Sequence, residues 1–267
     1  MSQAEQYLRD GQLALALSAL QNDVKADPAN AKHRVFLFQL LSVIGHWERA
    51  LTQLNVAGEL DAKNLAMVQT YREAIRCEIL RQKVFRGETT PLIFGEPEQW
   101  LANLIVALGL SAKGNDADAA ELRKVAFDQA PLTAGTINDQ AFEWLADADS
   151  RMGPVIEAIV NGKYYWIPFS RIAKISLDPP TDLRDLVWMP AQITWSNGGG
   201  SVALIPSRYP NTELAEDDSL RLARKTEWLE PFTDQFYGLG QRFLTTDVED
   251  FALFEVRELI LNTATGE

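Results

Sequence analysis

The feature that most constrains this chain is a set of five residues that repeats within its first third. Gly11, Ala16, Leu20, Asp27 and Asn30 recur at one constant offset of 34 residues, as Gly45, Ala50, Leu54, Asp61 and Asn64. A period of 34 residues is the length of a tetratricopeptide (TPR) repeat, which is a pair of antiparallel helices. Glycine permits the turn between two helices, and alanine lets the helices approach closely. The sequence therefore predicts TPR-like helical hairpins.

A third hairpin is predicted from Trp100 onward, where Gly114, Ala119 and Pro131 keep the spacing of the same residue types in the first copy. Residues 65–86 contain neither glycine nor proline and are predicted to form one helix, so the middle repeat is incomplete. The alternative is an unrelated helical bundle that uses glycine at two turns. Stacked hairpins would form a superhelix, whose concave groove typically binds an extended peptide or an amphipathic helix.

The TPR register predicts which side chains face that groove, because the first helix of each hairpin lines the inner wall. The expected partner-binding residues are Gln6, Arg9, Lys32, Val35, Gln39 and Ser42, with Gln69, Glu73 and Arg76 if the incomplete repeat keeps the register. The alternative interpretation of these positions is a polar face that only contacts solvent.

The second half of the chain has a different pattern, because eight of the twelve prolines lie after residue 150. Asn161 and Gly162 can supply the two positive φ angles of a type I′ turn. Strands are therefore predicted at 155–160 paired with 163–169, at 172–177, and at 187–195 paired with 201–205. Short strands with clustered aromatic residues indicate a small twisted sheet or a partly open barrel.

The chain is predicted to end in a helix, because Thr246 and Glu249 have the spacing of a capping box before an apolar run. The expected fold class is α+β, with an N-terminal TPR-like helical repeat domain followed by a smaller domain of antiparallel hairpins and a C-terminal helix. We place the first domain at residues 1–134 and the second at residues 135–267.

Charge and composition exclude several classes of function. The net charge is −12, and residues 135–267 carry 11 basic and 21 acidic side chains. An acidic surface does not attract phosphates, so no nucleic acid is expected as a partner. The longest strongly apolar run, 104–110, is far shorter than the ~20 residues of a membrane span. Charged residues within the first twenty positions argue against a secretory signal, so we expect a cytoplasmic protein that does not bind membranes.

The chain offers few groups for catalysis or metal binding. His33 and His46 are its only histidines, and Cys77 is its only cysteine, so no internal disulfide can form. Neither histidine accompanies a recognisable nucleophile, and Cys77 lies within a predicted helix without a CxxC partner. Zinc sites need more clustered ligands than this. We therefore expect no catalytic, cofactor or metal site.

Two acidic motifs come with a neighbouring arginine. Asp147 and Asp149 precede Arg151, and Asp182 and Asp185 flank Arg184. Arg151 and the residues that follow it break the calcium-loop pattern that Asp147 begins. Arginine–carboxylate bridges that hold loops are the simpler interpretation. The alternative is an enzyme that uses this Asp/Arg-rich region in a cleft of the second domain.

Six segments of the second half, in order, resemble the signature of the ImpE family, which is also called TagJ or SciE. They are residues 144–154, 161–169, 179–188, 205–210, 224–228 and 238–242. The motif residues, for which we expect a structural role, are Asp147, Asp149, Arg151, Arg184, Asp185, Arg208, Tyr209, Arg224, Trp228, Gln241 and Arg242.

The resemblance implies an accessory protein of bacterial type VI secretion that is not a catalyst. It implies a non-catalytic adaptor that binds an N-terminal helix of the small subunit of the contractile sheath. It further implies a link to the ClpV-type AAA+ ATPase that disassembles contracted sheath. A third hypothesis, beside adaptor and enzyme, is an element of a stable homo-oligomer whose acidic second half faces a basic partner.

Overall fold

The computed structural model describes residues 2–263 and has an α+β fold, as predicted. The helices of this part are α1 (Gln3–Arg9), α2 (Leu13–Ala26), α3 (Ala31–Val43), α4 (Trp47–Leu60), α5 (Leu65–Phe85), α6 (Gln99–Ser111), α7 (Asp116–Gln129) and α8 (Asp218–Arg221). The strands are β1 (Leu92–Ile93), β2 (Gly135–Ile137), β3 (Gln140–Phe142), β4 (Leu145–Asp147), β5 (Val155–Val160), β6 (Lys163–Pro168), β7 (Ile172–Leu177), β8 (Trp188–Trp195), β9 (Gly200–Pro206), β10 (Thr226–Phe232), β11 (Gln235–Gly240), β12 (Phe243–Thr246), β13 (Asp250–Ala252) and β14 (Glu258–Leu261).

The repeated residues occupy the positions that the 34-residue period predicts. Gly11 and Gly45 lie between the two helices of their hairpins, with φ of 73° and 76°. A side chain would be strained in this left-handed conformation, which explains glycine at both turns. Ala16 of α2 and Ala50 of α4 are completely buried. The hairpins α1–α2 and α3–α4 therefore form where the small residues recur.

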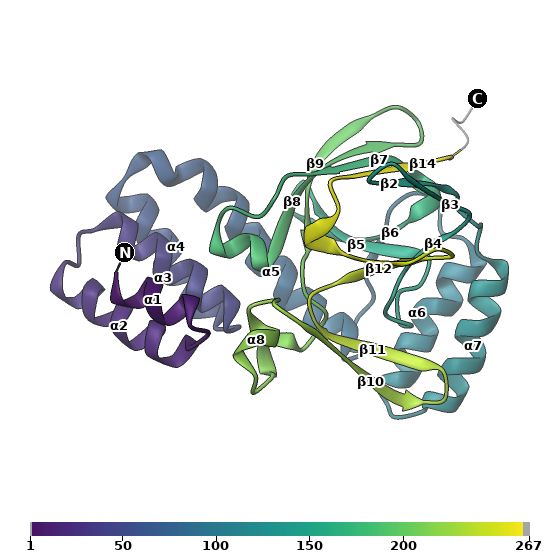
Figure 1. The fold of residues 1–267 in the computed structure, drawn as a ribbon, viewed down its shortest axis with the longest axis horizontal. Coiled ribbons are helices and arrows are strands. Elements are labelled where there is room, and N and C mark those ends of the chain that lie inside the picture. The colour runs from purple at the N-terminus through teal and green to yellow at the C-terminus, as the bar shows by residue number, and fades with distance from the viewer. Residues whose placement is uncertain (1, 264–267) are drawn as a thin grey trace.

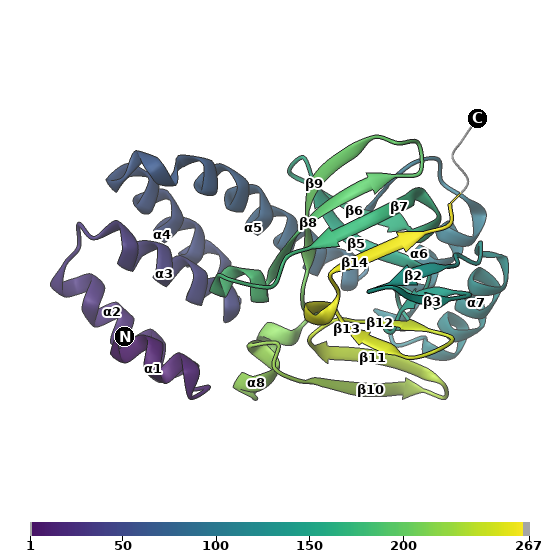
Figure 2. The ribbon, with the colours of Figure 1, turned by 45° about the horizontal axis from the view of Figure 1, so that its top comes forward.

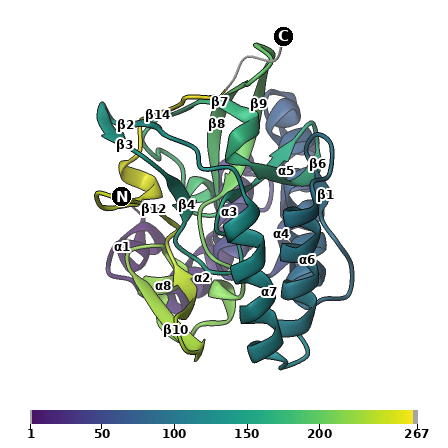
Figure 3. The same cartoon turned by 90° about the vertical axis from the view of Figure 1, so that its right-hand side faces the viewer.

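The third hairpin forms as expected but lies elsewhere in the molecule. Residues 65–86 are essentially the single helix α5, which leads away from α1–α4 toward the sheet (Figure 1). Hairpin α6–α7 lies at the opposite end of the molecule from α1–α4, where α6 and α7 run side by side (Figures 1 and 3). The three hairpins consequently do not stack into one continuous superhelix.

The second half is built on a twisted sheet with the strand order β1-β6-β5-β9-β8-β7-β14-β2-β3. Figure 2 shows β9, β8, β7, β14 and β2 crossing the molecule beside one another. The hairpin β5–β6 turns at Asn161 and Gly162, whose φ angles are 50° and 72°, as the Asn-Gly pair predicts. The predicted hairpin of 187–195 with 201–205 is β8–β9, and 172–177 is β7. Smaller sheets have the orders β13-β12-β4 and β10-β11.

The predicted C-terminal helix is wrong. Thr246 and Glu249 do bond to each other, because the Glu249 amide donates to Thr246 Oγ1 at 3.1 Å. This bond closes the turn between β12 and β13 instead of starting a helix. Strand β12 pairs with β4, and β14 pairs with both β7 and β2. The Thr246 hydroxyl can accept from the Glu249 amide in a tight turn as well as at the start of a helix. The segment forms strands and not a helix because β12 and β14 pair with strands from earlier in the chain.

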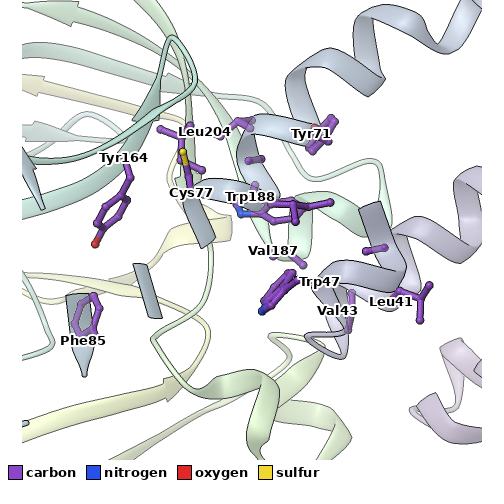
Figure 4. Close-up of a cluster of buried hydrophobic side chains, with 14 of the residues drawn as sticks. Leu41, Val43, Trp47, Tyr71, Cys77, Phe85, Tyr164, Val187, Trp188 and Leu204 are labelled. Atoms are coloured by element: carbon purple, nitrogen blue, oxygen red, sulfur yellow. The ribbon is translucent and has the colours of Figure 1, made fainter. Parts of the chain in front are cut away.

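One apolar core runs from the helical hairpins into the sheet. Trp188 of β8 lies between Trp47 of α4 and Tyr71 of α5, with ring centroids 5.9 and 5.8 Å apart (Figure 4). The same cluster continues through Cys77 and Phe85 of α5 to Tyr164 of β6. Strand β1 of the large sheet precedes α6, and the other strands of that sheet follow α7, beginning with β2. The division into two domains at residues 134 and 135 stays a prediction.

Candidate functional site

A groove of about 790 Å³ runs along α3, and the TPR register predicted part of its wall. Lys32, Val35 and Gln39 of α3 line it, together with residues of α1 and α2 and the loop 181–183. The side chain of Asn30 caps α3 by accepting from the amides of Lys32 and His33. This cap holds the first turn of α3 at the mouth of the groove.

The second half of the chain closes one side of this groove. The 3₁₀ turn Leu183–Leu186 packs against α3, and Leu183 lines the groove. Buried Asp185 holds the turn, because its carboxylate accepts from the amides of Thr181 and Asp182. Arg184 pairs with Asp182 and lies 4.7 Å over the ring of Tyr71. The turn 183–186 of the same chain therefore covers part of the inner face of α3.

The other predicted groove residues do not share this surface. Ser42 is completely buried, and its hydroxyl donates to the Phe38 carbonyl at 2.9 Å. Gln69 and Glu73 of α5 line a separate hollow of about 450 Å³ beside the β5–β6 turn. Exposed Arg76 pairs with Glu73.

Two further residues of that predicted set lie on α1. Gln6 donates to the carboxylate of Asp10, and Arg9 is exposed at the end of the helix. Neither lines the groove along α3. The nine residues therefore do not share one continuous face. The groove along α3 is lined by Lys32, Val35 and Gln39, the hollow by Gln69 and Glu73, and neither by Gln6, Arg9 or Arg76, while Ser42 is buried. Their role in binding a partner stays a prediction. The division arises because α5 leaves the repeat.

The groove along α3 has an apolar floor and a charged rim. Leu8, Leu20, Val35, Phe36 and Leu183 supply the apolar part. The rim carries the carboxylates of Glu5, Asp23, Asp61 and Asp182 and the ammonium groups of Lys32 and Lys63. An amphipathic helix would complement this groove, because the apolar anchors on one face of such a helix are flanked by charged residues.

A second candidate region is a cluster of charges buried between α5 and the sheet. Glu157 of β5 is completely buried and accepts two bonds from Arg81 of α5, at 2.7 and 2.8 Å. It also pairs with Arg242 and accepts from the hydroxyl of Tyr164. Burial by itself would raise the pKa of Glu157, but Arg81 and Arg242 outweigh it and lower the pKa to about 2. Glu157 is therefore ionised at neutral pH and links the α5 helix to the sheet.

Asp147 of β4 belongs to the same cluster, but its pKa is raised, whereas that of Glu157 is lowered. It is buried, pairs with Arg242 and accepts from the Asp149 amide at 2.9 Å. Burial raises its pKa to about 6, because the attraction of Arg242 offsets burial only in part and the neighbouring Asp149 adds repulsion. Asp147 also borders an apolar hollow of about 310 Å³.

Asp149 and Arg151 form a closed pair at the turn after β4. One Asp149 oxygen accepts from the amide and Nε of Arg151, and the other accepts from the Gly238 amide at 2.9 Å. The Arg151 guanidinium lies 4.5 Å from the centre of the Tyr237 ring and 5.2 Å from that of Phe85. This geometry fits the bridge that holds a loop, because every oxygen of the carboxylate is engaged.

Two motif arginines connect the second half to the ends of the first helices. Arg208 is buried and donates to the carbonyl of Val43, the last residue of α3, at 2.8 Å. Burial lowers its pKa to about 10. Arg224 donates to the carbonyls of Leu8 and Arg9 at the end of α1. A cation at a helix C-terminus satisfies free carbonyls there and interacts favourably with the helix dipole.

The remaining motif residues contact groups within the second half of the chain. Gln241 donates to the Ala223 carbonyl at 2.8 Å and accepts from the Phe254 amide. Trp228 packs on the ring of Tyr209, with centroids 5.4 Å apart. All of these contacts are consistent with the expected structural role, which stays a prediction.

Sequence reasoning missed the centre of the charge cluster. Glu78, Arg81, Glu157 and Tyr164 were not among the candidates, although Arg81 bonds both acids. A signal was available in β5, where Glu157 is the one charged residue of an otherwise apolar strand that is buried throughout. A lone acid at such a position requires a buried cation as a partner.

The described part of the chain shows neither a metal-site cluster nor a helix that could span a membrane. Within residues 2–263, no cluster of three or more His, Cys, Asp and Glu side chains has the arrangement of a metal site. In the same range, no helix combines the length and apolarity that crossing a membrane requires. Cys77 is buried, and burial raises the pKa of its thiol to about 12. It therefore packs as a small apolar side chain.

Comparison with known proteins relates the chain to a described family. The family described as ImpE protein matches residues 139–260. The type VI secretion system accessory component TagJ of Pseudomonas aeruginosa is 53% identical over 256 residues, which cover 96% of this chain and 90% of that protein. The identity extends through the helical hairpins as well as the sheet.

A solved structure has the same fold. The crystal structure of protein VPA1032 from Vibrio parahaemolyticus superposes with a TM-score of 0.89 over 97% of each chain. The two sequences are 24% identical, so this likeness concerns the fold alone. The arrangement of hairpins at both ends of a central sheet is thus shared by divergent sequences.

Proposed function

The chain belongs to the ImpE family, and from this premise we propose that it is a non-catalytic adaptor of a bacterial type VI secretion system. Its relative TagJ is described as an accessory component of that system. In this proposal the groove along α3 binds an N-terminal helix of the small sheath subunit. The protein also links the sheath to the ClpV-type AAA+ ATPase and acts in the cytoplasm.

The observation that carries the proposal is the groove itself. It is open, about 790 Å³ in volume, and combines an apolar floor with a rim of both charges. A helix laid in it would place apolar anchors on Val35 and Leu183 while its charged residues meet the rim. Because one wall comes from α3 and another from the loop 181–183, the groove needs both halves of the chain.

The charge cluster supports the non-catalytic part of the proposal. A general acid or base needs a carboxyl group that can reach a substrate. The side chains of Asp147 and Glu157 are fully buried and paired with arginines. The alternative, an enzyme with an Asp/Arg-rich cleft, has one favourable observation, which is that Asp147 has a pKa of about 6 and borders an apolar hollow.

The link to the ATPase rests on the family resemblance. A helix in the α3 groove would leave the opposite end of the molecule, with α6 and α7, free for a further partner (Figure 1). The link predicts that the protein with the sheath peptide bound still binds the ATPase.

Titration calorimetry with a peptide of the sheath subunit's N-terminal helix tests the proposal. We expect one-to-one binding that Val35→Asp weakens at least about tenfold, because it places a charge on the apolar wall. Arg76→Glu is the matched control, since Arg76 is exposed outside the groove and its substitution should leave the affinity within about twofold.

Two results would contradict the proposal, and each would identify a different error in it. If the folded protein does not bind the peptide, the sheath helix is the wrong partner. If Arg76→Glu weakens binding while Val35→Asp does not, the partner lies near α5 and the groove is the wrong site. Circular dichroism of each variant verifies that a loss of binding does not reflect unfolding.

A further inference from the structure

The ribbon formed by β10 and β11 leaves large apolar side chains uncovered. Trp228, Leu229 and Phe232 of β10 are 41, 53 and 41% exposed, and Phe236 of β11 is 41% exposed. The ribbon runs along the lower edge of the molecule, with β10 outermost (Figures 1 and 2). Exposed apolar residues that gather in one place mark interaction surfaces more often than single exposed ones do.

One edge of this ribbon has no partner strand. In the part of the chain that is described, β10 pairs with β11 alone. The other edge of β11 is occupied, because Ser150 donates to the Phe236 carbonyl and accepts from the Phe236 amide, both at 2.9 Å. The outer edge of β10 therefore presents backbone groups to which an extended segment can bond.

The ribbon is held firmly at its base. The Tyr237 hydroxyl lies 2.8 Å from that of Ser111 at the end of α6, and Arg123 of α7 bonds Gln235 at 3.0 Å. On the other face, Gly238 lies so close to Tyr209 that a Cβ atom would stand 2.1 Å from its ring. The uncovered side chains thus belong to a positioned platform with two faces, because the strand register places Leu229 and Phe232 on the face of Tyr237 and places Trp228 and Phe236 on the face of Gly238. Association would cost little conformational entropy in the ribbon.

The rim of the platform is acidic. Glu227 pairs with Lys225, but Glu230 and Asp234 have no cation within 4 Å among residues 2–263. Among the described residues, the Glu230 carboxylate accepts only from the Asp234 amide, at 3.1 Å, in the turn of the hairpin. Free carboxylates beside exposed aromatic rings attract cationic side chains through both the charge and the ring faces.

We propose that the β10–β11 ribbon is a docking surface for a basic, apolar segment of a partner protein, which adds in extended form beside β10. Charge complementarity selects this occupant. A second copy would bring Glu230 and Asp234 of two ribbons together, and an anionic membrane would be repelled in the same way. The inference concerns a surface separate from the α3 groove and does not depend on which partner fills that groove.

A short synthetic peptide of alternating leucine and lysine is the probe, with its leucine–glutamate counterpart as the charge control. We expect calorimetry to show one-to-one binding of the lysine peptide alone. The double substitution Leu229→Ser with Phe232→Ser should weaken it about tenfold, because it removes the apolar anchors and keeps every charge. Glu230→Gln, which retains the acceptor for the turn, should weaken it about threefold at low salt.

The matched control is Val202→Ser with Leu214→Ser, which removes two side chains that are 72 and 74% exposed elsewhere on the molecule. This control should leave the affinity of the lysine peptide unchanged. Equal loss in both double variants, or no loss in either, would overturn the proposal, because charge alone would then explain the binding. No binding of the lysine peptide to the folded protein would also overturn it.

Two other occupants are distinguished by the same variants. A protein that sediments as a dimer, and as a monomer after Leu229→Ser with Phe232→Ser, would assign the ribbon to a second copy and overturn the proposal. Binding to phosphatidylglycerol vesicles that the same substitutions abolish would assign it to a membrane surface and overturn it as well.

Discussion

The hairpins α1–α4 and the junction of α5 with the sheet are both well buried, but different chemistry holds them. Between the hairpin helices, completely buried Ala16 and Ala50 allow close apolar contact, and Leu20 and Leu54 fill the space beside them. At the junction, Glu157 lies between Arg81 and Arg242 with hardly any exposure to solvent.

The two regions should therefore tolerate substitutions to different degrees. An apolar contact loses free energy in proportion to the atoms removed and to the cavity left behind. A buried ion pair loses much more when one partner is removed, since the other charge stays in the protein without compensation. The hairpins should therefore accept sequence variation, whereas the junction requires its charged residues as a set.

The largest effect is expected at Glu157. Glu157→Gln keeps the size of the side chain but leaves Arg81 and Arg242 without a shared carboxylate. We expect the free energy of unfolding to fall by about 3–5 kcal/mol, measured by urea denaturation. A loss below about 1 kcal/mol would show that water or neighbouring acids already compensate these arginines.

Pairs of substitutions should reveal whether the hairpins and the junction contribute independently to stability. Glu157→Gln and Arg81→Met should be strongly non-additive, because the two residues share a bidentate ion pair. Glu157→Gln and Leu54→Ala of α4 should be additive within about 0.5 kcal/mol, because Leu54 belongs to the hairpin. Strong coupling in the second pair would mean that the hairpins and the junction are one energetic unit.

A moderate effect is expected in the pH dependence of stability. The folded pKa of Asp147 is about 6, above its ordinary value of 3.8, so the native state binds more protons than the unfolded state between these values. Stability therefore rises as the pH is lowered from 7 to 5, by about 1 kcal/mol from this group.

Asp147→Asn tests that expectation, because the amide has no proton to gain. The variant should be at least as stable as the unsubstituted protein at pH 7, because the raised pKa means that ionisation of Asp147 costs stability there, and it should lack the rise between pH 7 and 5. Glu157 acts in the opposite direction, since its lowered pKa of about 2 makes stability fall below pH 4.5. An unchanged rise in Asp147→Asn would assign the titration to another group.

The smallest effect is expected at Arg224, which joins the sheet half to α1 from an exposed position. Arg224→Ala should cost about 0.5 kcal/mol of global stability, because solvent replaces its hydrogen bonds. Hydrogen exchange of the α1 amides should nevertheless become faster, since the helix loses the cation at its C-terminus. Arg86→Ala, which breaks an exposed ion pair with Glu88, is the control that should leave α1 unchanged.

The sequence predicted the elements whose signals are local. Gly11 and Gly45 mark turns that need positive φ, and Asn161 with Gly162 marks a type I′ turn. These signals act over a few residues and need no partner from a distant part of the chain. Lys32 and Val35 do line a groove, because helical periodicity alone orients them, and their role in binding a partner stays a prediction.

The failures all involve partners that are far away along the chain. The Thr246–Glu249 spacing suits a helix start or a turn equally, and β4 decided for the turn by pairing with β12. Ser42 has the right register for an inner wall but is buried within the packed structure. Glu157 looked like an isolated acid in a strand, because Arg81 comes from a helix in the other half.

By itself the sequence determined the 34-residue helical period, the Asn-Gly hairpin and the family to which the chain belongs. Tertiary structure alone decided which charges meet in the core, which strand each edge pairs with, and which face of α3 stays open. The physical reason is that turns and helices close hydrogen bonds between near neighbours. Buried ion pairs and sheet edges instead depend on groups that only the folded chain brings together.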